Sequence, residues 1–261
     1  MTSHQTTTAP IDADELLAKV KDMYKAVAER PHEGFHFETG RDLAERLGYR
    51  PADLDRVPSG AIDSFAGVGY FFDLAELQPG ERVLDLGSGS GMDAFVAALQ
   101  VGDQGQVVGL DMTDEQLAKA ERLRAELGFD NVEFRSGLIE QLPFEDGAFD
   151  AVISNGVINL APDKDAVFSE ASRVLRAGGR LAIADIVTEE TLTDAIVTNV
   201  DLWASCIGGA PHEDVYQAAM TGAGPHVSVM KRNPYEFLSD QARNASADYG
   251  VKSVSVLART G

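Results

Sequence analysis

One short segment restricts the fold of this chain more than any other. An apolar run at residues 83–86 leads into Gly87-Ser-Gly-Ser-Gly91, and a helical pattern begins at Met92. Glycines at alternate positions allow sharp backbone angles and let a ligand approach the main chain, because no Cβ stands in the way. This order of strand, glycine-rich turn and helix predicts a ligand-binding turn within a βαβ unit.

Two aspartates end the first two predicted strands. Asp85 can accept a hydrogen bond from a cationic amine or hold the glycine loop, and Asp111 ends the strand at residues 107–110. An acid at the tip of the second strand can accept both hydroxyls of a ribose, so Asp111 indicates an adenosine ligand. NAD shares that ribose, but its fingerprint G-x-G-x-x-G needs a glycine at Met92, whereas the glycine here is Gly91.

From Glu81 onward, strands alternate with helices, which predicts βαβ units and a doubly wound, mostly parallel α/β sheet. Residues 227–231 and 252–258 are expected to close this sheet as an antiparallel pair. Ligands of such sheets bind at the carboxyl ends of the strands, where Asn155 ends the fourth strand. The predicted strands are residues 83–86, 107–110, 132–134, 149–154 and 181–186, and the predicted helices are residues 92–101, 113–127, 164–175, 194–206 and 213–221.

The N-terminal part carries a different pattern. Residues 12–30 have helical spacing, and residues 41–47 predict a short helix that ends at Gly48. Between them lies an aromatic loop that contains His36. We therefore expect an N-terminal helical or lid segment at residues 1–60 and a ligand-binding domain at residues 61–261.

Composition argues against several kinds of partner. Lys and Arg total 22 against 42 Asp and Glu, and the resulting net charge of −20 repels nucleic-acid phosphates. No apolar run reaches the roughly 18 residues that a membrane helix needs. The single Cys206 allows neither an internal disulfide nor a multi-cysteine metal site. These features predict a soluble, cytoplasmic protein that acts on a small molecule without a metal. They leave the oligomeric state open, with a homodimer as one option.

Several motifs resemble those of class I S-adenosylmethionine-dependent methyltransferases. They are Asp85-Leu-Gly-Ser-Gly-Ser-Gly91, residues 109–117, residues 154–160 and residues 174–181. Residues 154–164 and 206–210 are especially similar to arsenite methyltransferases and their relatives. The resemblance implies a seven-stranded, Rossmann-like methyltransferase fold with S-adenosylmethionine as cofactor. The cofactor contacts that we expect are Tyr70, Asp85, Gly87, Ser88, Gly89, Asp111, Met112, Gln116, Leu138, Ile139, Glu140 and Asn155.

The cysteine content departs from the arsenite methyltransferases that this chain resembles. Those enzymes hold the metalloid with several thiolates, whereas here only Cys206 is present and Gly156 stands where relatives can have a cysteine. One thiolate cannot build a three-sulfur site. Arsenite could serve as acceptor only if it arrived with thiolates already attached, for example as a glutathione adduct.

The expected function is methyl transfer to a small molecule, with a sulfur, selenium or metalloid acceptor. The catalytic candidates are Cys206 as a soft contact, His36 as a base and Asn155 beneath the reacting groups; Cys206 is equally well explained as a buried packing residue. An alternative is an O- or C-methyltransferase of an aromatic or quinone-like metabolite, which would need a base such as His36. Two alternatives belong to other functional classes: an NAD-dependent oxidoreductase and a non-catalytic cofactor-binding module.

Overall fold

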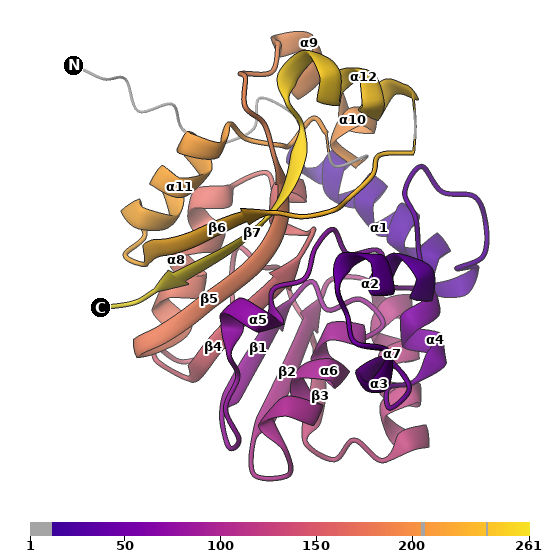
Figure 1. Cartoon of the computed structure of the whole chain (residues 1–261), viewed down its shortest axis with the longest axis vertical. Helices are drawn as coiled ribbons and strands as arrows, with labels where there is room; N and C mark the ends of the chain where they lie inside the picture. The colour runs from indigo at the N-terminus through magenta and orange to yellow at the C-terminus, as the bar shows by residue number, and fades with distance from the viewer. Residues whose placement is uncertain (1–11, 205–206, 239) are drawn as a thin grey trace.

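The computed structural model describes residues 12–204, 207–238 and 240–261. It contains a seven-stranded sheet in the order β3-β2-β1-β4-β5-β7-β6 (Figure 1). Strands β1 to β5 are parallel, and β7 runs antiparallel to both β5 and β6. The predicted fold class and the C-terminal antiparallel pair are therefore confirmed. The strands are β1 Arg82–Leu86, β2 Gln106–Asp111, β3 Val132–Ser136, β4 Phe149–Asn155, β5 Leu175–Val187, β6 His226–Arg232 and β7 Lys252–Arg259.

Helices cover both faces of the sheet because side chains alternate along each strand. In β1, for example, Val83 joins one buried apolar cluster and Leu84 joins another. The first cluster includes α6 and α7, and the second includes α8 and α11. The helices are α1 Ala13–Glu29, α2 Arg41–Leu47, α3 Pro51–Leu54, α4 Ser59–Asp63, α5 Phe72–Ala75, α6 Met92–Val101, α7 Asp114–Leu127, α8 Lys164–Val174, α9 Asp194–Val197, α10 Val200–Ala204, α11 Glu213–Gly222 and α12 Asp240–Tyr249, with a 3-10 turn η1 at Ile158–Leu160.

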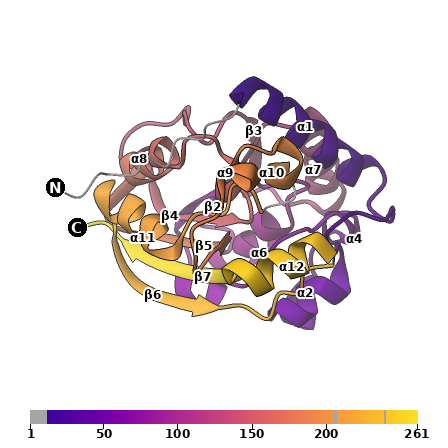
Figure 2. The same ribbon diagram turned by 90° about the horizontal axis from the view of Figure 1, so that it is seen from above.

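The strand order reverses between β1 and β4, which are neighbours in the sheet although β2 and β3 lie between them in sequence. The chain turns from β1 toward β2 in one direction and from β4 toward β5 in the other. The crevice at this point lies at the carboxyl ends of the strands, where open α/β sheets bind their ligands. Viewed from above, α9 and α10 lie over the sheet, with α1 and α12 beside them (Figure 2).

The predicted helix at residues 194–206 is wrong in its continuity. The structure has two short helices, α9 and α10, with Thr198 ending the first. The amide oxygen of Asn199 accepts a hydrogen bond from the Leu202 backbone N–H, so this side chain starts a new turn instead of continuing the helix. The indole N–H of Trp203 donates to the Val197 carbonyl, which folds α10 back against α9.

The N-terminal helices share a core with the sheet. Helix α4 crosses residue 60, and one apolar cluster contains Leu43 and Leu54 together with Val83 and Phe95. The division into a lid segment at residues 1–60 and a ligand-binding domain at residues 61–261 therefore remains a prediction about their functions. No helix in the described ranges is both long and apolar enough to cross a membrane.

A buried ion pair provides a test of this packing. The Arg180 side chain donates to the Ala75 carbonyl and to the Glu81 carboxylate, and the two charged side chains are only 9% and 11% exposed. We expect Arg180→Met to lower the free energy of unfolding by about 3 kcal/mol, because Glu81 keeps a buried, uncompensated charge. The control Arg122→Met removes an exposed pair with Glu126 and should cost at most about 0.5 kcal/mol in the same urea titration. Equal losses in the two variants would contradict this prediction.

Candidate functional site

The glycine-rich turn after β1 forms the floor of a pocket. Gly87, Gly89 and Gly91 have φ angles of 68°, 53° and 94°, in the left-handed region that favours glycine. A Cβ at Gly87 would lie 2.6 Å from the Val157 side chain, so this position also needs glycine for space. Above Gly89 the nearest atom to such a Cβ would be 3.8 Å away, on Gln116, which leaves the backbone open to a ligand.

The carboxylate of Asp111 ties the end of β2 to this turn. One of its oxygens accepts a hydrogen bond of 2.8 Å from the Gly89 N–H, and the other accepts one of 2.8 Å from the Thr113 N–H. Each carboxylate oxygen has a second lone pair, so Asp111 can still accept hydroxyl groups from a ligand. Burial raises the pKa of Asp111, and the N–H groups of Thr113 and Gly89 oppose that rise.

A second carboxylate, Asp93, lies beneath the pocket in a network with Asn155. Its two oxygens accept hydrogen bonds from the Tyr49 hydroxyl at 2.5 Å and the Asn155 amide at 3.0 Å. The Asn155 oxygen in turn accepts from the backbone N–H groups of Val68 and Gly69. Asn155 therefore joins β4 to the segment before β1, which makes it a positioning residue in this structure.

Buried carboxyl groups dominate the electrostatics of the pocket. Burial raises the pKa of Asp85 well above its ordinary value, and the charges of Asp93 and Asp111 add to the effect. Burial also raises the pKa of Asp93 to about 6. Glu140 is a fourth lining carboxyl, and the described residues that line the pocket include no Lys, Arg or His. Such a site stabilises a cationic ligand and disfavours an anionic one.

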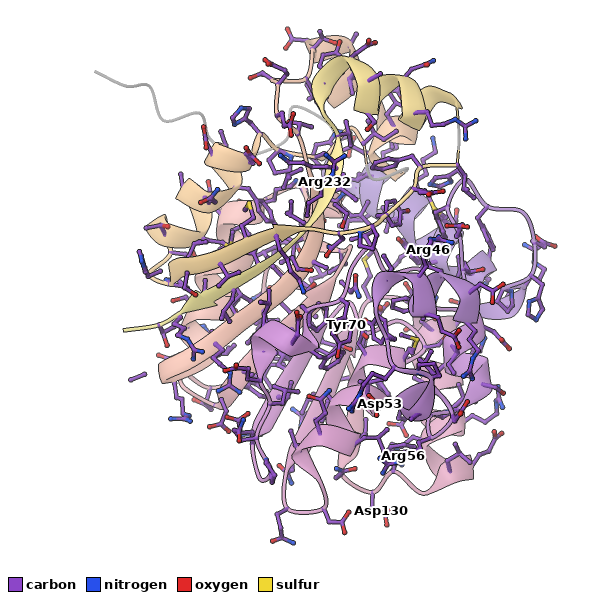
Figure 3. The ribbon with its side chains drawn as sticks, viewed as in Figure 1. Arg46, Asp53, Arg56, Tyr70, Asp130 and Arg232 are labelled. Atoms are coloured by element: carbon purple, nitrogen blue, oxygen red, sulfur yellow. The ribbon has the colours of Figure 1, made fainter. Side chains whose placement is uncertain are left out.

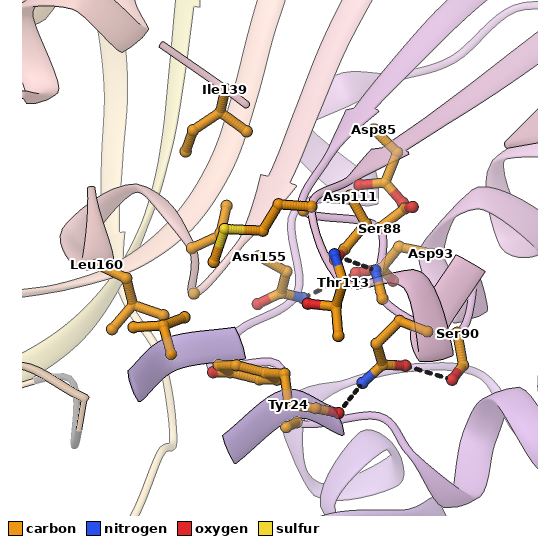
Figure 4. A pocket seen from close by; sticks show the side chains of 18 of the residues that line it. Tyr24, Asp85, Ser88, Ser90, Asp93, Asp111, Thr113, Ile139, Asn155 and Leu160 are labelled. Atoms are coloured by element: carbon orange, nitrogen blue, oxygen red, sulfur yellow. Dashed lines mark hydrogen bonds between the residues drawn. The ribbon is translucent and has the colours of Figure 1, made fainter. Parts of the chain in front are cut away.

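Helix α1 closes one side of this pocket, which we call its roof; in the view of Figure 4 this side, with Tyr24, lies at the bottom. From α1, the side chains of Leu17, Val20 and Tyr24 line the pocket. The Gln116 side chain bridges the two layers, since its oxygen accepts from the Ser90 hydroxyl and its amide donates to the Tyr24 carbonyl. No motif indicated this roof in the sequence, because helical spacing shows that a helix has an apolar face but not what that face covers.

All but one of the predicted cofactor contacts line this pocket. Tyr70, which is labelled in Figure 3, is the exception. Its ring packs against Tyr49 and Phe72, with ring centroids 5.0 and 5.8 Å apart. The backbone of the same segment reaches the pocket at Gly67 instead. The residues that line the pocket as expected are Asp85, Gly87, Ser88, Gly89, Asp111, Met112, Gln116, Leu138, Ile139, Glu140 and Asn155.

The catalytic candidates fare differently. Asn155 lines the pocket, whereas His36 does not, because its ring packs edge-on against Phe37 at 4.6 Å. Cys206 lies outside the described residues. No sequence pattern indicates Asp93 or Tyr49 as site residues, although Asp93 directly follows Met92 at the start of α6. No group of three or more metal-ligating side chains occurs in the described part of the chain.

Comparison with known proteins gives the same fold and places the chain in a family. The sequence profile described as "Methyltransferase domain" matches residues 77–241. This chain belongs to that methyltransferase family. The arsenite methyltransferase of Halobacterium salinarum is 43% identical over 220 residues, which cover 84% of this methyltransferase and 56% of the relative. The human arsenite methyltransferase is 44% identical over 137 residues, or 49% of this chain and 36% of the relative.

Solved structures agree with this assignment. A crystal structure of an arsenic(III) S-adenosylmethionine methyltransferase from Chlamydomonas reinhardtii has a TM-score of 0.64 at 33% identity, covering 84% of this chain and 73% of that one. A geranyl diphosphate C-methyltransferase from Streptomyces coelicolor, crystallised with S-adenosylhomocysteine, shares the fold with a TM-score of 0.67 at 18% identity, covering 94% and 98% of the two chains. S-adenosylmethionine is therefore the cofactor of this methyltransferase. The chain spans about half or less of the length of the curated arsenite methyltransferases that it matches.

The polar atoms and charges of the pocket are themselves suited to S-adenosylmethionine. The Asp85 Oδ2 atom and the Ser88 hydroxyl are buried without a hydrogen-bond partner in the described structure. A buried acceptor of this kind costs free energy unless a ligand satisfies it. The cofactor carries an ammonium and a sulfonium group, and the lining carboxylates supply the complementary charge.

The raised pKa of Asp93 predicts a pH dependence of stability. Between its ordinary value of 3.8 and the folded value of about 6, the folded state holds a proton that the unfolded chain releases. The protonated Asp93 carboxyl therefore stabilises the folded state. Its stabilising contribution is fully present below pH 3.8, the ordinary pKa, and is lost as the pH rises through about 6, the pKa in the folded protein. Over this pH range, the free energy of unfolding of the ligand-free wild type should fall by up to about 3 kcal/mol more than that of Asp93→Asn, as measured by urea unfolding. The variant Asp103→Asn, in an exposed loop, should follow wild type; identical pH dependence of Asp93→Asn and wild type would contradict the assignment.

Proposed function

We propose that this methyltransferase transfers the methyl group of S-adenosylmethionine to a soft acceptor, namely a sulfur, selenium or metalloid centre in a small molecule. The observation that carries the proposal is a pocket lined by four carboxyl groups, with no basic side chain among the described residues that line it. This lining favours a cationic methyl donor, and among its described residues there is no histidine to act as a base for a hard acceptor. The similarity to arsenite methyltransferases over 84% of the chain supports the acceptor class.

The proposed cofactor contacts follow from the pocket. The backbone at Gly87 and Gly89 would lie against the methionyl and ribose parts, and Asp111 would accept the ribose hydroxyls. Asp85 would receive the ammonium group at its unpartnered Oδ2 atom. Leu138 and Ile139 would supply apolar contact for the adenine. Each of these residues lines the same cavity.

Methyl transfer from this cofactor needs alignment more than proton transfer when the acceptor is soft. The bound cofactor supplies an electrophilic methyl group on a sulfonium. The chain must then position the acceptor about 3 Å from the methyl carbon and exclude water. Helix α1 performs the second task, since its residues Leu17, Val20 and Tyr24 close the pocket on one side. We assign the helical segment at residues 1–60 this role of a lid.

Cys206 is the proposed soft contact to the acceptor. As the only cysteine, it can provide one thiolate, so a metalloid acceptor must bring its other sulfur ligands with it. A glutathione-bound arsenical has that chemistry. A lone cysteine without an internal disulfide also fits a reducing compartment, so we place the protein in the cytoplasm.

An O- or C-methyltransferase is the second candidate. A quinone-biosynthesis C-methyltransferase from Teredinibacter turnerae is 34% identical over 163 residues, or 59% of this chain and 65% of that relative. Such chemistry calls for a general base, and His36 packs against Phe37 away from the pocket lining. Asp93 lines the pocket, but hydrogen bonds from Tyr49 and Asn155 already engage both of its oxygens. These contacts favour the soft acceptor.

Cofactor binding can be tested by isothermal titration with S-adenosylmethionine, S-adenosylhomocysteine and NAD. We expect both sulfur compounds to bind and NAD not to bind. Asp111→Ala should weaken both by about 100-fold, because it removes an acceptor for the ribose and an anchor of the glycine loop. Asp103→Ala changes the same charge far from the pocket and should bind like wild type. Unchanged affinity in Asp111→Ala would show that the cofactor placement is wrong.

The acceptor class can be tested by product formation with thiols, selenite, glutathione-bound arsenite and phenols. We expect methylation of the soft acceptors and none of the phenols. Cys206→Ser should lower kcat for the soft acceptors by about tenfold or more, because a hydroxyl is a poor soft contact, and should leave binding of S-adenosylhomocysteine unchanged. Methylation of phenols alone would favour the second candidate, and full activity of Cys206→Ser would leave Cys206 a packing residue. No turnover with intact cofactor binding would indicate a non-catalytic module.

A further inference from the structure

A buried lysine lies just behind the pocket wall. Lys164 begins α8 and is 2% exposed. Its ammonium group donates a hydrogen bond of 2.9 Å to the Ala161 carbonyl and lies 4.5 Å from the ring centroid of Trp203. A desolvated ammonium over an indole face is a favourable cation–π contact. Ala161 itself lines the pocket, so this contact connects the pocket wall to α10.

The charges around Lys164 come from several elements. Asp185 on β5 and Glu140 after β3 face it, and Asp163 and Asp165 are on its own segment. The Asp185 carboxylate already accepts hydrogen bonds from the Tyr216 hydroxyl and from two backbone N–H groups. Burial outweighs these negative charges and lowers the pKa of Lys164 to about 8. The charge of this lysine therefore changes close to the physiological range.

Trp203 is held on its other sides as well. Its indole N–H donates to the Val197 carbonyl at 2.7 Å. A Cβ at Gly208 would come within 2.4 Å of the indole Cδ1, and one at Gly209 would come within 2.8 Å of Cε3. The two glycines thus let the backbone pass close to the ring. This close approach explains the glycine pair that follows Cys206 in the sequence.

The indole also belongs to the roof of the pocket. It forms a small apolar cluster with Leu16, Val20 and Leu160, against which Tyr24 packs. Val20, Leu160 and Tyr24 all line the pocket. Helix α1 contacts α10, which carries Trp203, and also α7. A shift of Trp203 would therefore disturb the roof over the cofactor.

We propose that Lys164 is a positioning residue whose ammonium group holds Trp203, and through it α10 and α1, against the cofactor pocket, and that loss of its proton releases this contact. Lys164 touches neither cofactor nor acceptor in this role. The connection to the pocket rests on the proposed function, whereas the contact with Trp203 does not. Deprotonation removes the positive charge of Lys164 but leaves its apolar side-chain carbons in place. The cation–π contact with Trp203 is then lost, while the apolar contacts of the cluster around Trp203 remain.

The single tryptophan of the chain allows a direct test, because all tryptophan emission comes from Trp203. We expect the emission of the ligand-free wild type to change with a midpoint near pH 8, the pKa of Lys164. Lys164→Met should abolish this midpoint, and Lys164→Arg should keep the low-pH emission through the same range, since its guanidinium stays charged. The control Lys231→Met removes a cation that lies 5.9 Å from the Tyr70 ring and should titrate like wild type.

A second measurement tests the connection to the pocket. At about pH 7, where Lys164 is mostly charged, Lys164→Met should bind S-adenosylhomocysteine several-fold more weakly than wild type, and Lys164→Arg should restore most of the affinity. A wild type without a midpoint near pH 8, or one that persists in Lys164→Met, would overturn the contact with Trp203. Equal affinity of Lys164→Met and wild type would overturn the connection to the pocket. Absence of binding in wild type would instead refute the proposed function and leave the emission result standing.

Discussion

Four carboxyl groups line one pocket in which no described lining residue is basic, and this arrangement of charge explains much of the site. Burying carboxylates is costly, so each needs hydrogen bonds or an opposite charge. Asp111 and Asp93 receive hydrogen bonds from the protein, whereas Asp85 keeps a buried oxygen without a partner. A cationic ligand can provide the hydrogen-bond donor and the positive charge that Asp85 lacks within the protein. The site therefore suits S-adenosylmethionine and would disfavour an anionic nucleotide.

The same arrangement requires that the pocket be closed, because charges interact more strongly when water is excluded. Helix α1 provides the closure, and it is anchored by side chains that face it from α7. Gln116 donates to the Tyr24 carbonyl, and Lys119 donates to the Ala28 carbonyl and the Ser64 hydroxyl. At its other end α1 packs on the cluster around Trp203. The positive charge of Lys164 thus lies outside the pocket, where it can hold the roof without competing with the cofactor.

The residues of this chain indicate the methyl acceptor less clearly than they indicate the cofactor. Similarity to arsenite methyltransferases extends over most of this chain, but the thiolates that would define a metalloid site are reduced to Cys206. Affinity for a soft metalloid depends on several soft ligands acting together. The proposed acceptor, which carries its own sulfur ligands, would reconcile the two observations. The described lining residues include no histidine, which agrees with an acceptor that needs no base.

The parallel sheet, the glycine turn and the acid at Asp111 can all be predicted from the sequence, because each depends on local spacing. The signals are strand and helix periodicity, glycine at positive φ and a carboxylate at a strand end. It could not place Tyr70 or His36, whose rings pack against aromatic neighbours, nor foresee that Asn199 would interrupt the helix predicted at residues 194–206. Two further features, the closure of the pocket by α1 and the contact between Lys164 and Trp203, follow from folding and not from any local pattern. Those contacts join residues far apart in the chain, and they exist only because the folded sheet brings α1, α8 and α10 to one edge.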